Sequence, residues 1–177
     1  MRIIGITGWS GAGKTSLITR LIPHLVGQGL SVSTLKHAHH RFEIDVPGKD
    51  SYEHRIAGAR EVMISSRTRF AIVHELRDAE ERTLGELLGK FEAVDVVLVE
   101  GFKRERHPKI EVYRQCVGKP KLHPGDETIV AVAADVPLPE AGRPVFALDD
   151  IAGIAAIALA HAAPVETVRA GSVGWRS

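Results

Sequence analysis

The sequence predicts an α/β protein: a three-layer α/β/α sandwich with a mostly parallel sheet and a β-hairpin insertion. Three observations carry this prediction. A glycine-rich loop joins an apolar run to a helical segment near the N-terminus, short apolar runs alternate with helical patterns along the chain, and two strand patterns within residues 61–74 are separated by a tight polar turn. The 177 residues, of which 44% are hydrophobic and 25% charged, suffice for one domain with a full core.

The glycine-rich loop is the strongest motif. Residues 8–15 read Gly-Trp-Ser-Gly-Ala-Gly-Lys-Thr, which fits G-x-x-x-x-G-K-[ST]. Residues 2–7 ahead of it suit a buried strand, and residues 16–22 behind it have helical spacing. The glycines let backbone N–H groups approach phosphate oxygens, Lys14 would lie between the β- and γ-phosphates, and Thr15 would offer its hydroxyl to Mg²⁺. This order of elements predicts a P-loop NTPase fold that binds a nucleotide.

The rest of the chain supplies the remaining layers of the sandwich. Strands are predicted for residues 30–35, 94–99, 109–114, 128–133 and 144–148, and helices for residues 51–59, 83–91 and from Asp149 or Asp150 to about residue 161. The valine-rich run 94–99 is typical of a central strand buried on both faces, whereas residues 109–114 alternate like an edge or half-exposed strand. Residues 1–165 are therefore predicted to form a P-loop nucleotide-binding domain, and residues 166–177 a C-terminal tail.

The region between the second strand and residue 75 exceeds what a minimal sheet of this class needs. Residues 36–51 form a long polar segment with Pro and Gly, typical of a functional or mobile loop. Residues 61–66 and 69–74 are predicted to pair as an antiparallel hairpin. We therefore expect residues 39–75 to be an insertion of loop and hairpin. Several apolar hairpin side chains need burial: Val62, Met63, Ile64, Phe70, Ile72 and Val73.

Carboxylates provide candidates for a magnesium site. Glu100 directly follows the buried strand 94–99, and Gly101 allows a sharp turn beside it. Because ligands bind outside the carboxyl ends of parallel strands, Glu100 is expected to share an edge with the phosphate loop, where it would hold Mg²⁺ or orient an attacking water. Its alternative role is to cap the segment that follows. Asp45, in the long loop, is a second candidate for the metal shell, against the alternative of a solvated position.

The same edge of the sheet is expected to carry an excess of basic residues: Lys36, Arg41, Lys49, Lys103, Arg104 and Arg106, with His37, His39 and His40. In a chain of net charge +1, this concentration indicates a second phosphorylated ligand or an acidic partner, although loops also acquire basic residues by chance. The histidines are an alternative metal site, but their spacing matches no HExxH helix.

Composition narrows the compartment and the partners. The net charge of +1 gives no global basic excess of the kind that nucleic-acid binding favours. Cys116 is the only cysteine, so no intramolecular disulfide forms and a reducing cytoplasm fits. No signal peptide pattern precedes the first strand, and no apolar run has the length of a membrane span. We therefore expect a cytoplasmic protein without nucleic-acid or membrane partners.

Several of these motifs together resemble the molybdopterin-guanine dinucleotide biosynthesis adaptor proteins of the MobB type. The resemblance covers most of the chain. The phosphate loop is shared by many unrelated proteins, but its combination with later motifs is far more specific: Lys36-His37-Ala38-His39-His40, Asp45-Val46-Pro47-Gly48-Lys49-Asp50-Ser51, Ala57-Gly58-Ala59 and Leu98-Val99-Glu100-Gly101-Phe102-Lys103.

The resemblance implies a GTP-binding protein that dimerises and assists the guanylyltransferase that attaches GMP to molybdopterin. Carried over by position, the nucleotide-phosphate ligands are Gly11, Ala12, Gly13, Lys14, Thr15 and Ser16, and Asp45 and Glu100 lie near Mg²⁺. The usual guanine-reading sequence Asn-Lys-x-Asp is absent, and Asp135, at the end of a late strand, is the residue in the corresponding place. Guanine preference therefore rests on the resemblance. The hairpin, which would extend its own sheet or that of a second copy, supports the implied dimer.

Three functions compete at this stage. The first is the adaptor, a slow GTPase that couples nucleotide state to a partner enzyme. The second is a small-molecule kinase with the same phosphate loop, which ranks lower because the sequence has no compact helical lid segment rich in arginine. The third is a non-catalytic module that senses nucleotide.

Overall fold

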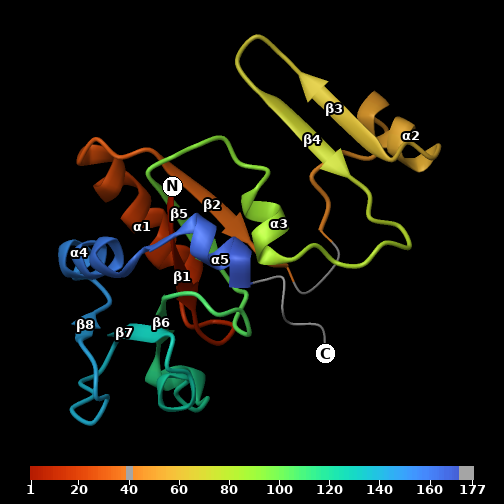
Figure 1. Cartoon of the computed structure of the whole chain (residues 1–177). Coiled ribbons are helices and arrows are strands. Elements are labelled where there is room, and N and C mark those ends of the chain that lie inside the picture. Colours follow the sequence, from red (N-terminus) through yellow and green to blue (C-terminus); the bar gives the residue numbers. More distant parts are fainter. Residues whose placement is uncertain (39–41, 172–177) are drawn as a thin grey trace. The chain divides into compact units, whose positions relative to one another are not determined.

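The structure, a computed structural model, describes residues 1–38 and 42–171 (Figure 1). The chain divides into two compact units, one of residues Met1–His37 with Thr83–Ser177 and the other of residues Ala38–Arg82. The insertion expected at residues 39–75 lies within the second unit, which continues beyond the hairpin to Arg82. In the described part of the chain, no helix has both the length and the apolar character needed to cross a membrane.

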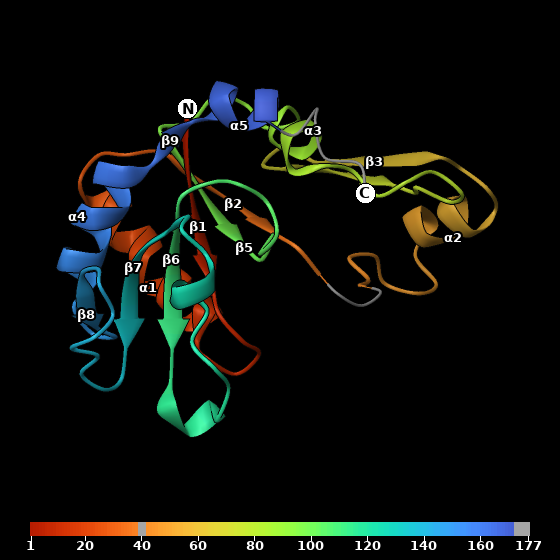
Figure 2. The same ribbon diagram turned by 60° about the horizontal axis from the view of Figure 1, so that its bottom comes forward.

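The larger unit is built on a seven-stranded sheet (Figure 2). Its order is β2-β5-β1-β6-β7-β8, with every neighbouring pair parallel. The strand β9 pairs antiparallel with the N-terminal end of β1. The strands are β1 (Arg2–Thr7), β2 (Val32–Lys36), β5 (Val96–Glu100), β6 (Lys109–Tyr113), β7 (Ile129–Ala134), β8 (Val145–Ala147) and β9 (Ala163–Pro164). This confirms the mostly parallel sheet predicted from the sequence.

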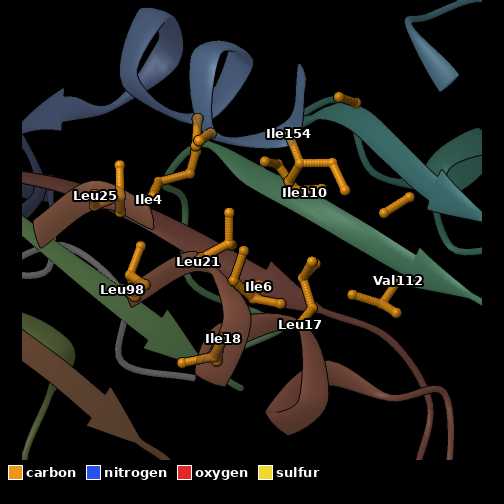
Figure 3. Packing of buried hydrophobic residues seen from close by; sticks show 14 of the residues in the cluster. Ile4, Ile6, Leu17, Ile18, Leu21, Leu25, Leu98, Ile110, Val112 and Ile154 are labelled. Carbon is orange, nitrogen blue, oxygen red and sulfur yellow. The ribbon is translucent and has the colours of Figure 1, made fainter. Parts of the chain in front are cut away.

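Helices cover both faces of the sheet. On one face, α1 (Lys14–Gly27) and α4 (Ile151–His161) pack on alternate residues of the strands in a cluster that includes Leu21, Leu98 and Ile154 (Figure 3). On the other face, α3 (Leu84–Leu88) and α5 (Val165–Gly171) pack against β2, β5 and the start of β1. The three-layer α/β/α architecture is therefore confirmed. Two short 3₁₀ turns, η1 (Gln115–Val117) and η2 (His123–Gly125), follow β6.

The position of β6 corrects one prediction. The alternating pattern of residues 109–114 predicted an edge or half-exposed strand, but β6 lies between β1 and β7, and its first four residues are buried. The polar residues in that pattern are buried with partners: the Lys109 Nζ donates to Asp126 Oδ2 at 3.3 Å and to Thr128 Oγ1 at 2.6 Å. Alternation in this strand therefore separates an apolar face from a buried polar one, rather than from solvent.

The C-terminal region corrects another prediction. A tail was expected from residue 166, but α5 occupies Val165–Gly171. Val165 and Val168 are spaced at i and i+3, so both reach the cluster that also contains Leu84 of α3. Their burial explains why this segment is helical instead of loose. Residues 172–177, including Trp175, lie outside the described residues.

The unit of residues 38–82 contains α2 (Asp50–Ile56) and the antiparallel hairpin of β3 (Glu61–Ser65) and β4 (Phe70–His74), which confirms the predicted hairpin. Val62 is buried and Val73 is half-buried, but four other apolar side chains of this hairpin are exposed: Met63, Ile64, Phe70 and Ile72. The Arg55 guanidinium joins three carboxylates, those of Glu43, Asp45 and Glu75.

Candidate phosphate-binding site

The phosphate loop connects β1 to α1. Gly8, Gly11 and Gly13 have φ angles of 144°, 81° and 97°, a region that side chains disfavour. Gly8 is also required for steric reasons, because an added Cβ would clash with the Val112 carbonyl oxygen of β6. Gly13 is the N-cap residue of α1, so the free N–H groups of the first helical turn open directly behind the loop. This backbone forms a cradle suited to an anion.

Lys14 bends back over the loop. Its Nζ donates to the carbonyl oxygens of Gly8 and Trp9, each at 3.0 Å. Burial lowers the pKa of Lys14; the nearby Glu100 carboxylate opposes this effect, and the ammonium groups of Lys103 and Lys36 add to it. Several positive charges thus lie around one carboxylate at this site, and a bound polyanion would reduce the repulsion between them.

Glu100 lies where the sequence predicted it. The Thr15 hydroxyl donates to both of its carboxylate oxygens at 3.2 Å, and the Lys36 Nζ lies 3.4 Å from its Oε1. The structure therefore brings together the ends of β2 and β5 and the start of α1. A hydroxyl beside a carboxylate is a hard-oxygen pair of the kind that Mg²⁺ accepts while its other positions are filled by water and phosphate. These residues fit a magnesium ion.

A tight turn follows Glu100. Gly101 and Phe102 have φ angles of 97° and 49°, and the Phe102 ring stacks on the His37 ring with centroids 4.7 Å apart. Gly101 must lack a side chain, because a Cβ there would lie 2.8 Å from the His37 Cβ. The segment after β2 is thereby packed on the turn after β5.

Three residues of the predicted basic and histidine-rich segment, His39, His40 and Arg41, lie outside the described residues. Within residues 1–38 and 42–171, no group of three or more His, Cys, Asp or Glu side chains is placed to hold a metal ion.

Three contacts of the phosphate loop were not anticipated from the sequence. The Trp9 Nε1 donates to the Pro120 carbonyl at 2.7 Å, the Lys103 Nζ lies 4.4 Å from the centroid of the Trp9 ring, and the Arg114 Nε donates to the Ala12 carbonyl at 3.1 Å. Burial lowers the pKa of Lys103, while the Glu111 carboxylate opposes this shift. The available signal for Arg114 was a basic residue at the end of the predicted strand 109–114, but that strand had been interpreted as an edge or half-exposed strand.

The remaining predicted residues have other surroundings. Asp45 belongs to the unit of residues 38–82, where its carboxylate accepts from Ser51 Oγ at 3.0 Å and lies 3.4 Å from Arg55 Nε. Asp135 follows β7, is exposed, and accepts from the Gln115 backbone N–H at 2.9 Å. Arg106 pairs with Glu127, while Lys49 and Arg104 are exposed.

In this parallel sheet, the first strand leads through a glycine-rich loop into a helix, and the neighbouring strand β5 ends in a carboxylate. This arrangement defines the P-loop NTPase-like class. A family model described as "Molybdopterin guanine dinucleotide synthesis protein B", MobB, matches residues 3–135. The chain belongs to this family.

Relatives and solved structures agree with this assignment. The chain is 42% identical over 139 residues to the molybdopterin-guanine dinucleotide biosynthesis adapter protein of Escherichia coli strain K12, covering 77% of this chain and 79% of the relative. The adapter protein of Haemophilus influenzae is 43% identical over 138 residues, with 77% and 76% covered.

Among solved structures, one of molybdopterin-guanine biosynthesis protein B has a TM-score of 0.71 at 29% identity, covering 89% of this chain and 97% of that one. The structure of Bacillus subtilis MobB has a TM-score of 0.71 at 25% identity, covering 92% and 98%.

Proposed function

We propose that this protein is a GTP-binding adapter with slow GTPase activity that assists the attachment of GMP to molybdopterin during biosynthesis of molybdopterin guanine dinucleotide. The observation that carries the proposal is the bond from Thr15 to both oxygens of Glu100, directly beside the glycine cradle. This pair has the chemistry of a magnesium site next to a phosphate site. The adapter role is supported by the relatives, which are described as adapter proteins.

Each residue of the site has a distinct task in this proposal. Lys14 exchanges its bonds with the Gly8 and Trp9 carbonyls for the β- and γ-phosphate oxygens, which are stronger acceptors. The Thr15 hydroxyl and the Glu100 carboxylate hold Mg²⁺, directly or through water. Bound Mg²⁺ neutralises charge that develops on the phosphates. Glu100 also orients the attacking water.

Guanine selectivity is assigned to Asp135, whose carboxylate can accept from the N1–H and N2–H groups of guanine. Adenine lacks that pair of donors. The bond from the Gln115 N–H occupies only Oδ1 and fixes the orientation of the carboxylate. Asp45 is kept as a second candidate for the metal shell; its bonds to Ser51 and Arg55 would have to be exchanged for that role.

The partners follow from charge and exposed apolar surface. Lys36 and Lys103, beside the phosphate loop, suit an acidic face of a guanylyltransferase or the phosphate of molybdopterin as a second ligand. The exposed apolar side chains of β3 and β4 suit a homodimer, since each strand of this two-stranded sheet has an unpaired edge. A reducing cytoplasm is the proposed compartment.

Nucleotide binding is tested with Lys14→Ala. Loss of a charge aimed at phosphate should weaken Mg-GTP binding by about tenfold to a hundredfold, because charge-assisted hydrogen bonds contribute about 1.5–3 kcal/mol. Titration calorimetry measures the affinity, and unchanged thermal unfolding shows that the fold is retained. Lys90→Ala, at an exposed lysine after α3, is the matched control. Undiminished affinity of Lys14→Ala would remove the loop from nucleotide binding.

Hydrolysis is tested with Glu100→Gln. This variant should still bind Mg-GTP but produce GDP more slowly. The neutral amide has no negative charge to balance that of Mg²⁺, and it does not accept a proton from the attacking water. Turnover equal to that of the wild type would exclude Glu100 from the reaction. If the nucleoside diphosphate formed only when a small phosphoryl acceptor was added, the result would support a kinase instead. Stable binding without any turnover would support a nucleotide sensor.

A further inference from the structure

Arg114 contacts the phosphate loop from the side of β6. Its Nε donates to the Ala12 carbonyl oxygen at 3.1 Å. The guanidinium also lies against Gly13: an added Cβ on that residue would be 3.2 Å from Nε and 3.6 Å from one terminal nitrogen of Arg114. The side chain therefore lies on the peptide that joins Ala12 to Gly13, directly ahead of Lys14.

The backbone around Arg114 is held on both sides. The preceding residues belong to β6, in which Glu111 is aligned with Thr7 of β1, the strand that enters the phosphate loop. Arg114 itself is extended, with φ −129° and ψ 128°, and the N–H of the next residue, Gln115, donates to Asp135 Oδ1 at 2.9 Å. These anchors fix the distance from which the guanidinium reaches the loop.

The bond to Ala12 determines where the next N–H points. In a planar trans peptide, the C=O of one residue and the N–H of the following residue point in opposite directions. Because Arg114 holds the Ala12 carbonyl on one side of the loop, the Gly13 N–H is directed to the other side. The positive charge on the guanidinium also polarises this peptide and makes its N–H a stronger donor.

We propose that Arg114 is a positioning residue for polyphosphate, which holds the Ala12–Gly13 peptide so that its N–H faces the phosphate groups. This inference rests on the proposed function, because it concerns the same site. It assigns to β6 a part in phosphate binding that complements Glu100 on β5: Arg114 orients the backbone of the loop, and Glu100 faces the side chain of Thr15.

The inference separates phosphate binding from base binding. A peptide N–H that faces phosphate serves Mg-GTP and inorganic tripolyphosphate alike, whereas a contact with the base serves GTP alone. Arg114→Met keeps much of the aliphatic stem and removes both charge and donor; Arg114→Lys keeps the charge and one donor group. These two variants separate the bond to the loop from simple packing.

The experiment measures the affinity of the full chain for Mg-GTP and for tripolyphosphate by calorimetry, in the wild type, Arg114→Met, Arg114→Lys and Lys14→Ala. Arg114→Met should weaken both ligands by a similar factor, about tenfold. Arg114→Lys should recover part of that loss, and thermal unfolding should show that both variants fold. If either variant fails to fold, Arg114→Gln, which keeps a donor without charge, replaces it in the same comparison.

The inference would be overturned, with the proposed function left standing, by wild-type affinity in Arg114→Met while Lys14→Ala binds more weakly, or by a loss confined to GTP with tripolyphosphate unaffected. Equal losses in Arg114→Met and Arg114→Lys would also contradict it, because the charge and donor of lysine would then have no effect. A wild-type protein that binds neither ligand would overturn the proposed function as well.

Discussion

The two faces of the sheet differ most where β1 lies beside β6. On the face covered by α1 and α4, the buried side chains of these strands are apolar: Ile4, Ile6, Ile110 and Val112 (Figure 3). The alternate residues on the opposite face are Gly5, Thr7, Lys109 and Glu111, all buried. One pair of neighbouring strands thus supports an apolar core and a buried polar strip, which we define as these four residues together with His107 and His123.

The covering layers differ accordingly. Helices cover the apolar face, whereas Lys109 and Glu111 of the polar strip find their partners in the loops and 3₁₀ turns that follow β6. The Glu111 carboxylate accepts from the backbone N–H groups of Leu122 and His123 at 2.7 and 2.9 Å, and the His123 Nδ1 lies 2.9 Å from its Oε2. The same covering segment carries Arg114 and Pro120, which hold the phosphate loop. The apolar face therefore stabilises the fold, and the polar strip positions loops around the candidate site.

The largest expected effect comes from Glu111→Ala. The substitution leaves two backbone N–H groups and the His123 side chain without their acceptor in a buried place. Breaking a buried charged network of this kind costs about 3–5 kcal/mol. Urea unfolding would measure the loss of stability.

The neighbouring residue on the same strand provides the control. Ile110→Val removes one methylene from the apolar face, for about 0.5–1.5 kcal/mol. If Glu111→Ala costs no more than Ile110→Val, the polar strip does not order the loops above it, and the contrast between the faces fails.

A smaller effect is expected from Gly5→Ala. An added Cβ would lie 2.5 Å from His107 Nε2 and 2.9 Å from Lys109 Cγ, so the strip would be overpacked at a cost of about 1–3 kcal/mol. Thermal unfolding would measure it. The double variant Gly5→Ala with His107→Ala should lose less stability than the sum of the two single variants, because the atom closest to the added Cβ is removed. If the costs of the two single variants simply add, the strain does not come from the contact with His107.

The sequence predicted the parts of this molecule that follow from local pattern. The phosphate loop, the valine-rich strand ending in Glu100 and the hairpin were each marked by a motif or a period, and the meeting of Thr15, Lys36 and Glu100 followed from the rule that parallel strands end at one edge. The placement of these residues is confirmed. Their roles in nucleotide and metal binding stay predictions.

The polar strip could not be predicted in the same way. Lys109 and Glu111 in alternation with Ile110 and Val112 have the period of a strand that is half in water, and only the partners from distant segments, such as Asp126, make their burial tolerable. Because β6 was interpreted as an edge or half-exposed strand, Arg114 at its end was not placed beside the phosphate loop. Similarly, the seven-residue α5 is too short for a helical period to distinguish it from a tail.

The most delicate test of the polar strip is its response to acid. His107 is 2% exposed, and among the described residues neither of its ring nitrogens has a hydrogen-bond partner. Burial, assisted by the Lys109 ammonium, lowers the pKa of His107 from 6.5 to about 3. Above the unfolded pKa, the ring is neutral in both states. As the pH falls below the unfolded pKa, the imidazole is protonated in the unfolded chain but stays neutral in the folded chain. The free energy of unfolding therefore falls by at most about 1.4 kcal/mol per pH unit until the folded pKa is reached.

His107→Leu should remove this dependence without a large cost at neutral pH, because replacing an unpaired buried polar group by an apolar one of similar shape is nearly neutral. Urea unfolding of both proteins between pH 7 and pH 4 measures the difference, and subtraction cancels the carboxylates that they share. The two stabilities should agree most closely near pH 7 and then diverge, with the wild type losing more. Parallel curves would show that His107 takes up its proton in the folded state, which would require water or a carboxylate in contact with its ring; this face of the sheet would then be more hydrated than the apolar one.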